Sequence, residues 1–195
     1  MDVTFVASAY TPQQFPPPDR PEVAFAGRSN VGKSSLLNKL TNRRHLASTS
    51  CKPGKTRSIN FFSVANDLYL VDLPGYGYAR VPVTIRKGWK KLVETYLLQR
   101  RSLKLVVLIL DIRRDPGADD MDLINWLHHH GIPLLVVLTK ADKLSKQKAL
   151  SRLIAVSKAL GNSNLPTPLL FSARTGMGVA QLWDAINRFT LAPPS

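Results

Sequence analysis

The chain carries the stretch Gly27-Arg28-Ser29-Asn30-Val31-Gly32-Lys33-Ser34, which matches the phosphate-loop pattern G-x-x-x-x-G-K-[ST]. Its glycines let the backbone wrap closely around phosphate oxygens, and a helix that starts at the end of the loop adds free N–H groups and its dipole. An apolar segment at 22–26 predicts a strand before the loop, and leucines at helical spacing in 33–41 predict a helix after it. This context favours a nucleotide phosphate site over a glycine-rich turn without a ligand.

Two side chains of this loop carry chemistry of their own. Lys33 is expected to reach the β- and γ-phosphates of a nucleotide, and the Ser34 hydroxyl is expected to ligate Mg²⁺. The identity of the base has to come from other segments of the chain.

The remaining pattern predicts one sheet with helices on both faces. Further strands are expected at 4–7, 59–65, 68–71, 105–110, 134–138 and 168–171, and helices at 84–99, 119–129, 145–160 and 179–189. Strands that alternate with helices indicate an α/β fold with a single doubly wound, mostly parallel sheet. The tight Asn66-Asp67 turn predicts a hairpin, and hence one antiparallel strand.

The first part of the chain has a different composition. Residues 10–21 contain five prolines and predict an extended connector. We therefore expect residues 1–21 to form an N-terminal strand and a Pro-rich connector packed on a domain of residues 22–195. No internal repeat and no second domain is evident in the sequence.

Two later segments indicate the base. Thr139-Lys140-Ala141-Asp142 follows an apolar segment and is similar to the N-K-x-D guanine motif of GTPases, with Thr in place of Asn. The Asp142 carboxylate can accept hydrogen bonds from guanine N1–H and its 2-amino group, a pair that adenine lacks, and the stem of Lys140 could lie along the base. Phe171-Ser172-Ala173 resembles the loop that offers a backbone N–H to guanine O6. Each segment is a weak signal alone, since a helix-capping Asp after a strand explains Asp142 equally well.

A third segment, Asp72-Leu73-Pro74-Gly75, fits the D-x-x-G pattern. Asp72 is expected to hold Mg²⁺ through a water, and the Gly75 N–H to sense the γ-phosphate. Thr56, within the long basic segment 42–58, can supply a second hydroxyl for Mg²⁺. A strand that ends in a Pro-Gly turn would explain this segment alone. All the motifs, each at the carboxyl end of a predicted strand, together predict a guanine-nucleotide site at that edge of the sheet.

The charge of the chain points to a polyanionic partner. There are 27 Lys and Arg against 13 Asp and Glu, a net charge of +14. Such a surplus is typical of proteins that bind nucleic acid or an anionic membrane surface, with a merely basic surface as the alternative. Residues 28–104 carry 16 basic and 3 acidic residues, a net +13, against −2 for 1–27 and +3 for 105–195. The partner is therefore expected to bind around the middle of the chain.

The composition favours a globular protein of the cytoplasm. Apolar residues make up 44% and charged residues 21%, which are ordinary values. The longest apolar run, 105–110, is far shorter than the ~20 residues that span a bilayer, and no secretory signal pattern is evident. Cys51 is the single cysteine, so a disulfide within the chain is excluded.

Together these segments resemble one family. The wording of 25–38, 54–57, 72–79 and 138–144 is similar to that of the EngB family of bacterial GTPases, among the translation-factor-related P-loop GTPases. The resemblance covers nearly the whole chain, and Tyr-Gly-Tyr-Ala after D-L-P-G is close to a signature of the family. Thr139 in place of Asn is usual in it.

The resemblance implies a P-loop small GTPase fold, hydrolysis of GTP to GDP and phosphate, and Mg²⁺ as cofactor. The positions implied to contact GTP are Gly27, Arg28, Ser29, Asn30, Val31, Gly32, Lys33, Ser34, Ser35, Gly54, Lys55, Thr56, Arg57, Ser58, Asp72, Leu73, Pro74, Gly75, Thr139, Lys140, Ala141, Asp142, Phe171, Ser172 and Ala173. The metal ligands would be Ser34 and Thr56, with Asp72 acting through a water.

The family is associated with late assembly of the large ribosomal subunit and with cell division and septation. Ribosomal RNA would account for the basic residues of the first switch loop and of the second switch with its helix. These residues are Arg43, Arg44, Lys52, Lys55 and Arg57, and Arg80, Arg86, Lys87, Lys90, Lys91, Arg100 and Arg101. The hypothesis is that GTP orders these loops in a monomer and so presents a cationic face to the RNA.

Catalysis is expected to be slow without a partner. Ras-type enzymes place a Gln just after D-x-x-G to orient the attacking water, and this chain has Tyr76 there. No certain catalytic residue follows from the sequence; Lys33 is the phosphate candidate and Asn30 the candidate for holding K⁺ beside the phosphates. The expectation is that a trans-acting group or the ribosome accelerates hydrolysis.

Two other function classes stay open. An RNA-binding assembly factor could use GTP as a structural ligand with negligible hydrolysis, and Tyr76 keeps this alternative alive. A P-loop ATPase or small-molecule kinase is the other; Asp142 and the absence of a lid segment argue against it.

Overall fold

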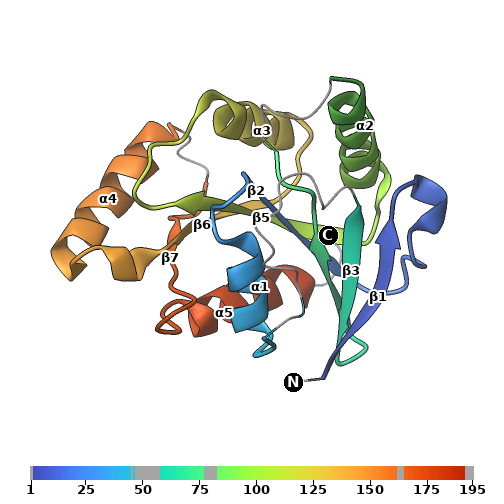
Figure 1. Ribbon diagram of the computed structural model, residues 1–195, viewed down its shortest axis with the longest axis horizontal. Helices are drawn as coiled ribbons and strands as arrows, with labels where there is room; N and C mark the ends of the chain where they lie inside the picture. The colour runs from blue at the N-terminus through green and yellow to red at the C-terminus, as the bar shows by residue number, and fades with distance from the viewer. Residues whose placement is uncertain (1, 45, 47–57, 77–82, 162–164, 192–195) are drawn as a thin grey trace.

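The described strands form one seven-stranded sheet. The computed structural model describes residues 2–44, 46, 58–76, 83–161 and 165–191, with the backbone alone for 83–90. The strands are β1 (Val3–Ala9), β2 (Glu22–Gly27), β3 (Ile59–Val64), β4 (Leu68–Asp72), β5 (Leu103–Asp111), β6 (Leu134–Thr139) and β7 (Leu169–Leu170). Their order across the sheet is β1-β3-β4-β2-β5-β6-β7 (Figure 1).

One strand runs against the others. β3 pairs antiparallel with both β1 and β4, whereas the β2–β4, β2–β5, β5–β6 and β6–β7 pairs are parallel. The predicted hairpin therefore exists, but its turn is centred one residue earlier than expected. Ala65 and Asn66 both have positive φ angles, of 48° and 61°, and β3 ends at Val64. This agrees with the prediction of a mostly parallel sheet with one antiparallel strand.

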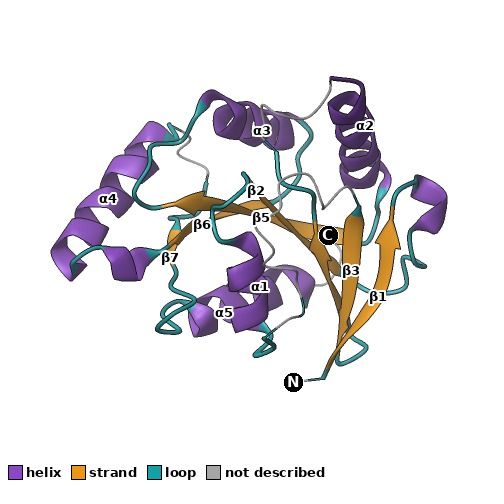
Figure 2. Ribbon diagram, viewed as in Figure 1, coloured by secondary structure: helices purple, strands orange, loops and turns teal. Residues whose placement is uncertain are grey.

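The helices cover both faces of the sheet (Figure 2). They are α1 (Lys33–Leu40), α2 (Val83–Gln99), α3 (Ala118–His129), α4 (Lys146–Ala159) and α5 (Val179–Thr190), with short 3₁₀ turns at Pro12–Gln14 and Ala141–Lys143. Buried residues of α2, α3 and α4 share one hydrophobic cluster, and those of α1 and α5 share another. The predicted doubly wound α/β fold is confirmed.

The central strand β5 shows why its sequence is an uninterrupted apolar run. Val106, Leu108 and Leu110 pack into the cluster under α2, α3 and α4, whereas Leu105, Val107 and Ile109 pack into the cluster under α1 and α5. Successive side chains of a strand point to opposite faces, and here both faces are covered. The strand consequently needs apolar residues at every position.

The N-terminal segment is attached to the sheet at two places. β1 extends the edge beyond β3, and the Phe15 ring packs on Phe61 and Tyr96 with centroid distances of 5.8 and 5.7 Å. The Arg100 guanidinium also donates to the Pro16 carbonyl at 2.6 Å. The division into 1–21 and 22–195 stays a prediction, but the two parts share these contacts.

A buried carboxylate lies where the connector enters β2. Glu22 is fully buried and accepts hydrogen bonds of 2.8 Å from the Tyr96 hydroxyl, the Arg100 Nε and the Ser102 hydroxyl. The Arg100 side chain is only 9% exposed. A buried charge pair of this kind is costly to break, because removing one partner leaves the other charge uncompensated.

We therefore expect Glu22→Gln to lower the free energy of unfolding by about 3–5 kcal/mol. Urea denaturation monitored by circular dichroism measures the change. The matched control is Asp19→Asn, which removes the carboxylate from the exposed Asp19–Arg20 pair and should change stability little. Equal losses in the two variants would contradict a special role for the buried pair.

Candidate functional site

The predicted motifs lie at one edge of the sheet. The phosphate loop follows β2, Asp72 ends β4, Thr139 ends β6, and Phe171 follows β7. Because these strands are parallel, their carboxyl ends meet at the same edge, which is where ligands bind in open α/β sheets. The fold therefore brings together segments that are up to about 140 residues apart in the chain.

The phosphate loop is held tightly against β5. A Cβ added at Gly27 would lie 2.9 Å from the Ile109 carbonyl oxygen and 2.9 Å from a methyl of Val31, so only glycine fits there. Gly32 has a φ of 103°, and α1 begins at the next residue. The first N–H groups of α1 have no partner within the helix, which suits them to phosphate oxygens.

Thr139 fixes the far side of this loop. Its hydroxyl donates to the Val31 carbonyl at 2.5 Å, and the Leu110 carbonyl lies 3.1 Å from the same hydroxyl oxygen. Thr139 is buried, at 3% exposure. The motif that suggested a base site thus also ties the end of β6 to the phosphate loop, a role that the sequence analysis did not foresee.

Lys33 and Asp72 lie in contact. The Lys33 ammonium donates to the Asp72 carboxylate, forming an ion pair, and Asp72 is 4% exposed. Ser34 is the next residue of α1. A hydroxyl and a carboxylate are oxygen donors of the kind that Mg²⁺ prefers, so these residue types fit the predicted metal site.

The two weak guanine motifs are joined directly. The Ser172 hydroxyl donates to the Asp142 carboxylate at 2.7 Å, and the Ala141 N–H donates to the Phe171 carbonyl at 3.1 Å. The hydrogen bond from Ser172 lowers the pKa of Asp142 below its usual value, which keeps the carboxylate ionised. An ionised, oriented acceptor at this place is what recognition of guanine requires.

Lys140 has partners that the sequence analysis missed. Its ammonium donates to the Asn30 carbonyl at 2.7 Å and to the Asp111 carboxylate at 2.9 Å, bridging the phosphate loop and the end of β5. Asp111 also accepts two hydrogen bonds from the Arg113 guanidinium, at 2.9 and 2.7 Å. Burial alone would raise the pKa of Asp111, but the hydrogen bonds from Arg113 and Lys140 outweigh it and lower the pKa well below the usual value. The signal in the sequence that could have indicated this contact is the position of Asp111 at the end of an apolar strand.

Tyr76 is directed toward α3. Its hydroxyl donates to the Asp120 carboxylate at 2.7 Å, and the other oxygen of that carboxylate accepts from the Gly117 N–H at 2.8 Å. The backbones of Tyr76 and Arg28 form an isolated parallel bridge. Burial and the neighbouring Asp120 raise the pKa of Tyr76 far above its usual value, so the phenol stays neutral.

The other predicted positions have varied surroundings. Gly75 lies close to the phosphate loop, since a Cβ there would be 3.2 Å from the Ser29 hydroxyl oxygen. Ser58 is buried and its hydroxyl donates to the Asn60 side chain at 3.0 Å. Leu73 and Pro74 are buried, Ser35 is exposed, and Ala173 is half-buried.

Part of the expected site lies outside the described residues. This applies to Gly54, Lys55, Thr56 and Arg57, and to Lys52 and Arg80. The side chains of Arg86, Lys87 and Lys90 also lie outside the description, although their backbone belongs to α2. The second Mg²⁺ hydroxyl, from Thr56, therefore stays a prediction.

The described residues were also compared with what a metal cluster and a membrane span require, and they fit neither. Over the described part of the chain, no three or more His, Cys, Asp or Glu side chains are grouped so that they could hold a metal. Among the helices described here, none has the length and apolar character needed to cross a membrane.

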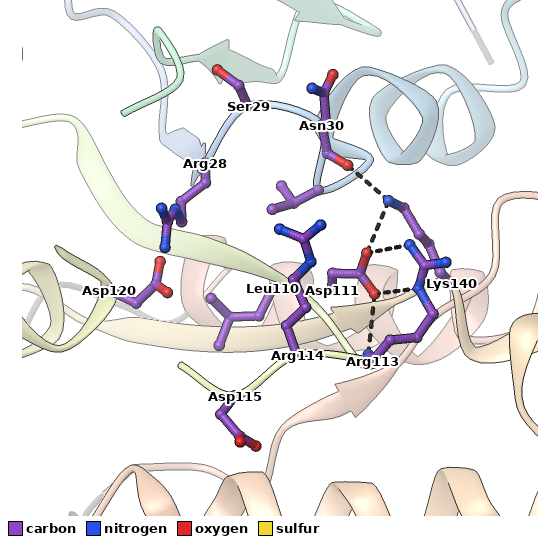
Figure 3. Close-up of a pocket in the computed structure, with 11 residues that line it drawn as sticks. Arg28, Ser29, Asn30, Leu110, Asp111, Arg113, Arg114, Asp115, Asp120 and Lys140 are labelled. Carbon is purple, nitrogen blue, oxygen red and sulfur yellow. Dashed lines mark hydrogen bonds and ion pairs between the residues drawn. The ribbon is translucent and has the colours of Figure 1, made fainter. Parts of the chain in front are cut away.

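A cavity of about 460 Å³ opens beside the phosphate loop (Figure 3). Its walls come from the loop residues 28–31, the end of β5 with the segment after it, the start of α3, and Lys140. The lining contains neither Lys33 and Ser34 nor Asp72, and neither Asp142 nor Ser172. The cavity therefore adjoins the predicted phosphate and base positions, and it shares residues 28–31 and Lys140 with the predicted GTP contacts.

Comparisons with known proteins agree with this geometry. A family model described as 50S ribosome-binding GTPase matches residues 22–140. A probable GTP-binding protein EngB of Syntrophus aciditrophicus (strain SB) is 50% identical, over 95% of this chain and 94% of its own. A probable GTP-binding protein EngB of Shouchella clausii (strain KSM-K16) is 48% identical, over 89% of this chain and 88% of its own.

Solved structures show the same fold at lower identity. The crystal structure of a probable GTP-binding protein EngB superposes with a TM-score of 0.69 at 23% identity, covering 87% of this chain and 98% of that one. Era in complex with MgGDPNP and nucleotides 1506–1542 of 16S ribosomal RNA gives a TM-score of 0.71 at 21% identity, covering 90% and 58%. The predicted P-loop GTPase fold is confirmed.

The anchoring role of Thr139 can be tested by removing its hydroxyl. We expect Thr139→Val to lower the free energy of unfolding by about 1–3 kcal/mol, because the buried Val31 carbonyl loses its donor. Denaturation in urea measures the loss. Thr139→Ser keeps the hydroxyl and should stay close to the parent protein; if the Val and Ser variants are equally stable, the hydrogen bond is not what holds the loop.

Proposed function

Because the chain belongs to the EngB family of GTP-binding proteins and is a GTPase, we propose that it is a GTP-controlled switch acting in assembly of the large ribosomal subunit. The observation that carries this proposal is the net +13 of residues 28–104, the stretch that begins at the phosphate loop and runs through α2. The matching family model, described as a 50S ribosome-binding GTPase, supports the same partner. A role in normal cell division and septation, as a monomer of the cytoplasm, belongs to the proposal.

In this proposal one group of described residues binds the phosphates and Mg²⁺, and another group binds the guanine base. Lys33 and the N–H groups at the start of α1 hold the β- and γ-phosphates, and Gly75 beside Ser29 contacts the γ-phosphate. Ser34 would ligate Mg²⁺ and Asp72 would hold it through a water, and the ion would supply positive charge beside the phosphate oxygens. Asp142, oriented by Ser172, binds the guanine edge.

Hydrolysis by the isolated protein is slow in this proposal. The hydroxyl of Tyr76, at the position of the usual Gln, is engaged by Asp120, and its phenol stays neutral. A tyrosine held in this way neither accepts a proton from water nor orients it as an amide would. The ribosome or a trans-acting group therefore supplies what is missing. The rival is an RNA-binding assembly factor in which GTP is only a structural ligand.

Single-turnover hydrolysis of GTP, with and without purified large subunits, separates these two. We expect slow hydrolysis by the protein alone and an increase of about tenfold or more with large subunits, since groups supplied in trans to related GTPases give about 10³–10⁵-fold. Binding to the subunits without any acceleration would favour the rival. No binding to the subunits would overturn the proposed partner.

The choice of base is tested at Asp142. In Asp142→Asn an amide replaces the carboxylate, so the two acceptors for guanine N1–H and the 2-amino group are no longer both present. We expect GTP affinity to fall by about 100-fold, because leaving polar groups unpaired costs about 1–3 kcal/mol for each group. Titration with a fluorescent guanine nucleotide measures this, and Asp184→Asn on the exposed surface of α5 is the control. An unchanged affinity would remove Asp142 from the site.

Potassium dependence is tested at Asn30, which has a φ of 68° and an exposed side chain on the phosphate loop. We propose that this amide helps to hold K⁺ beside the phosphates, where the cation offsets charge as an arginine would. Turnover should then be several-fold faster in K⁺ than in Na⁺ buffer, and Asn30→Ala should abolish the difference. Equal turnover of the parent protein in the two buffers would end this part of the proposal.

A further inference from the structure

The cavity beside the phosphate loop contains two arginines that have no side-chain partner among the described residues. Arg28 comes from the loop itself and Arg114 from the segment after β5, and both are exposed. Neither guanidinium makes a hydrogen bond or an ion pair within the part of the chain that the structure describes. Figure 3 shows Arg114 extending from the segment after β5 toward the phosphate loop, and Arg28 turned toward Asp120.

The carboxylates around the same cavity are already engaged. Asp111 is bound by both Arg113 and Lys140, and Asp115 is paired with Arg152 of α4 at 2.9 Å. Asp120 accepts from Tyr76 and from the Gly117 N–H. With Arg152 included, five cationic groups face three carboxylates here. The group as a whole therefore carries a net charge of +2.

The position of Arg28 depends on the glycine at 117, just before α3. A Cβ added at Gly117 would lie 2.8 Å from the Arg28 Nη1, so the absence of a side chain at 117 gives the guanidinium its place. Arg28 is also fixed through its backbone, which bridges to Tyr76. Both arginines line a space of about 460 Å³, within the range of about 300–1,000 Å³ that small ligands occupy.

We propose that this cavity, here called the arginine pocket, binds a backbone phosphate of RNA between Arg28 and Arg114. Planar guanidinium groups bind phosphate through paired N–H donors. RNA is favoured as the source because residues 28–104 carry a net charge of +13, the charge on which the proposed ribosomal partner rests. The inference rests on the proposed function, since it places one contact of the proposed ribosomal RNA.

The test is the salt dependence of RNA binding. The probe is a protein-free transcript of large-subunit ribosomal RNA, bound to protein loaded with MgGDPNP over about 50 to 200 mM salt. Arg114→Gln should weaken binding several-fold and reduce the slope of log K against log salt by about 0.7–0.9, the loss of one phosphate contact. Arg114→Lys keeps the charge and should keep the slope, which a purely structural role of the side chain would not explain.

The matched control is Arg188→Gln on α5, an exposed arginine on the other face of the sheet, which should keep the parent slope. The inference is overturned if the parent binds RNA and Arg114→Gln shows the parent slope. It is also overturned if titration with GDP reveals a second equivalent that Arg114→Gln removes, because the occupant is then a free nucleotide. If the parent itself does not bind the transcript, the proposed ribosomal RNA partner fails first.

Discussion

The arrangement of the site depends on how closely the phosphate loop is held to the middle of the sheet. Gly27 leaves no room for a side chain against Ile109, and the Thr139 hydroxyl binds the Val31 carbonyl from the neighbouring strand. These contacts fix the loop relative to β5 and β6, so its N–H groups point in one direction before any ligand arrives. Preorganised donors of this kind lose little entropy on binding an anion. The loop that carries the predicted phosphate contacts is therefore held in place by its packing against β5 and by the hydrogen bond from β6.

Much of the fold follows from local patterns. The helix expected at 145–160 is found at Lys146–Ala159, because Ser145 caps its first turn by accepting from the Lys148 N–H. The strand expected at 105–110 is two residues longer at its start and one at its end, since periodicity marks the apolar centre of a strand better than its ends. The strand expected at 168–171 shrinks to Leu169–Leu170, an edge strand with pairing on one side only. The ends of helices and strands depend on contacts with other parts of the chain, which the sequence of one segment does not contain.

The site was less predictable than the fold, for the same reason. Sequence order could place Asp142 and Ser172 at one edge of the sheet, but their hydrogen bond depends on tertiary geometry. The Lys140 ammonium reaches Asp111 at the end of β5 and the Asn30 carbonyl in the phosphate loop, two partners that sequence spacing does not reveal. Tyr76 was correctly identified as an unusual residue at its position. Its hydrogen bond to Asp120, which lies 44 positions later in the chain, cannot be predicted from a short motif. The motifs identify the residues of the site, whereas the distances between their side chains depend on how the sheet folds.

The buried Glu22 network limits how α2 can move. Tyr96 and Arg100, at and just beyond the last turn of the helix, are both bonded to Glu22, and Arg100 also holds the Pro16 carbonyl. The end of α2 is thereby tied both to the first residue of β2 and to the Pro-rich connector. Parts of the chain that are up to 80 residues apart meet at this one buried carboxylate, so a change in any of them alters the packing of the others.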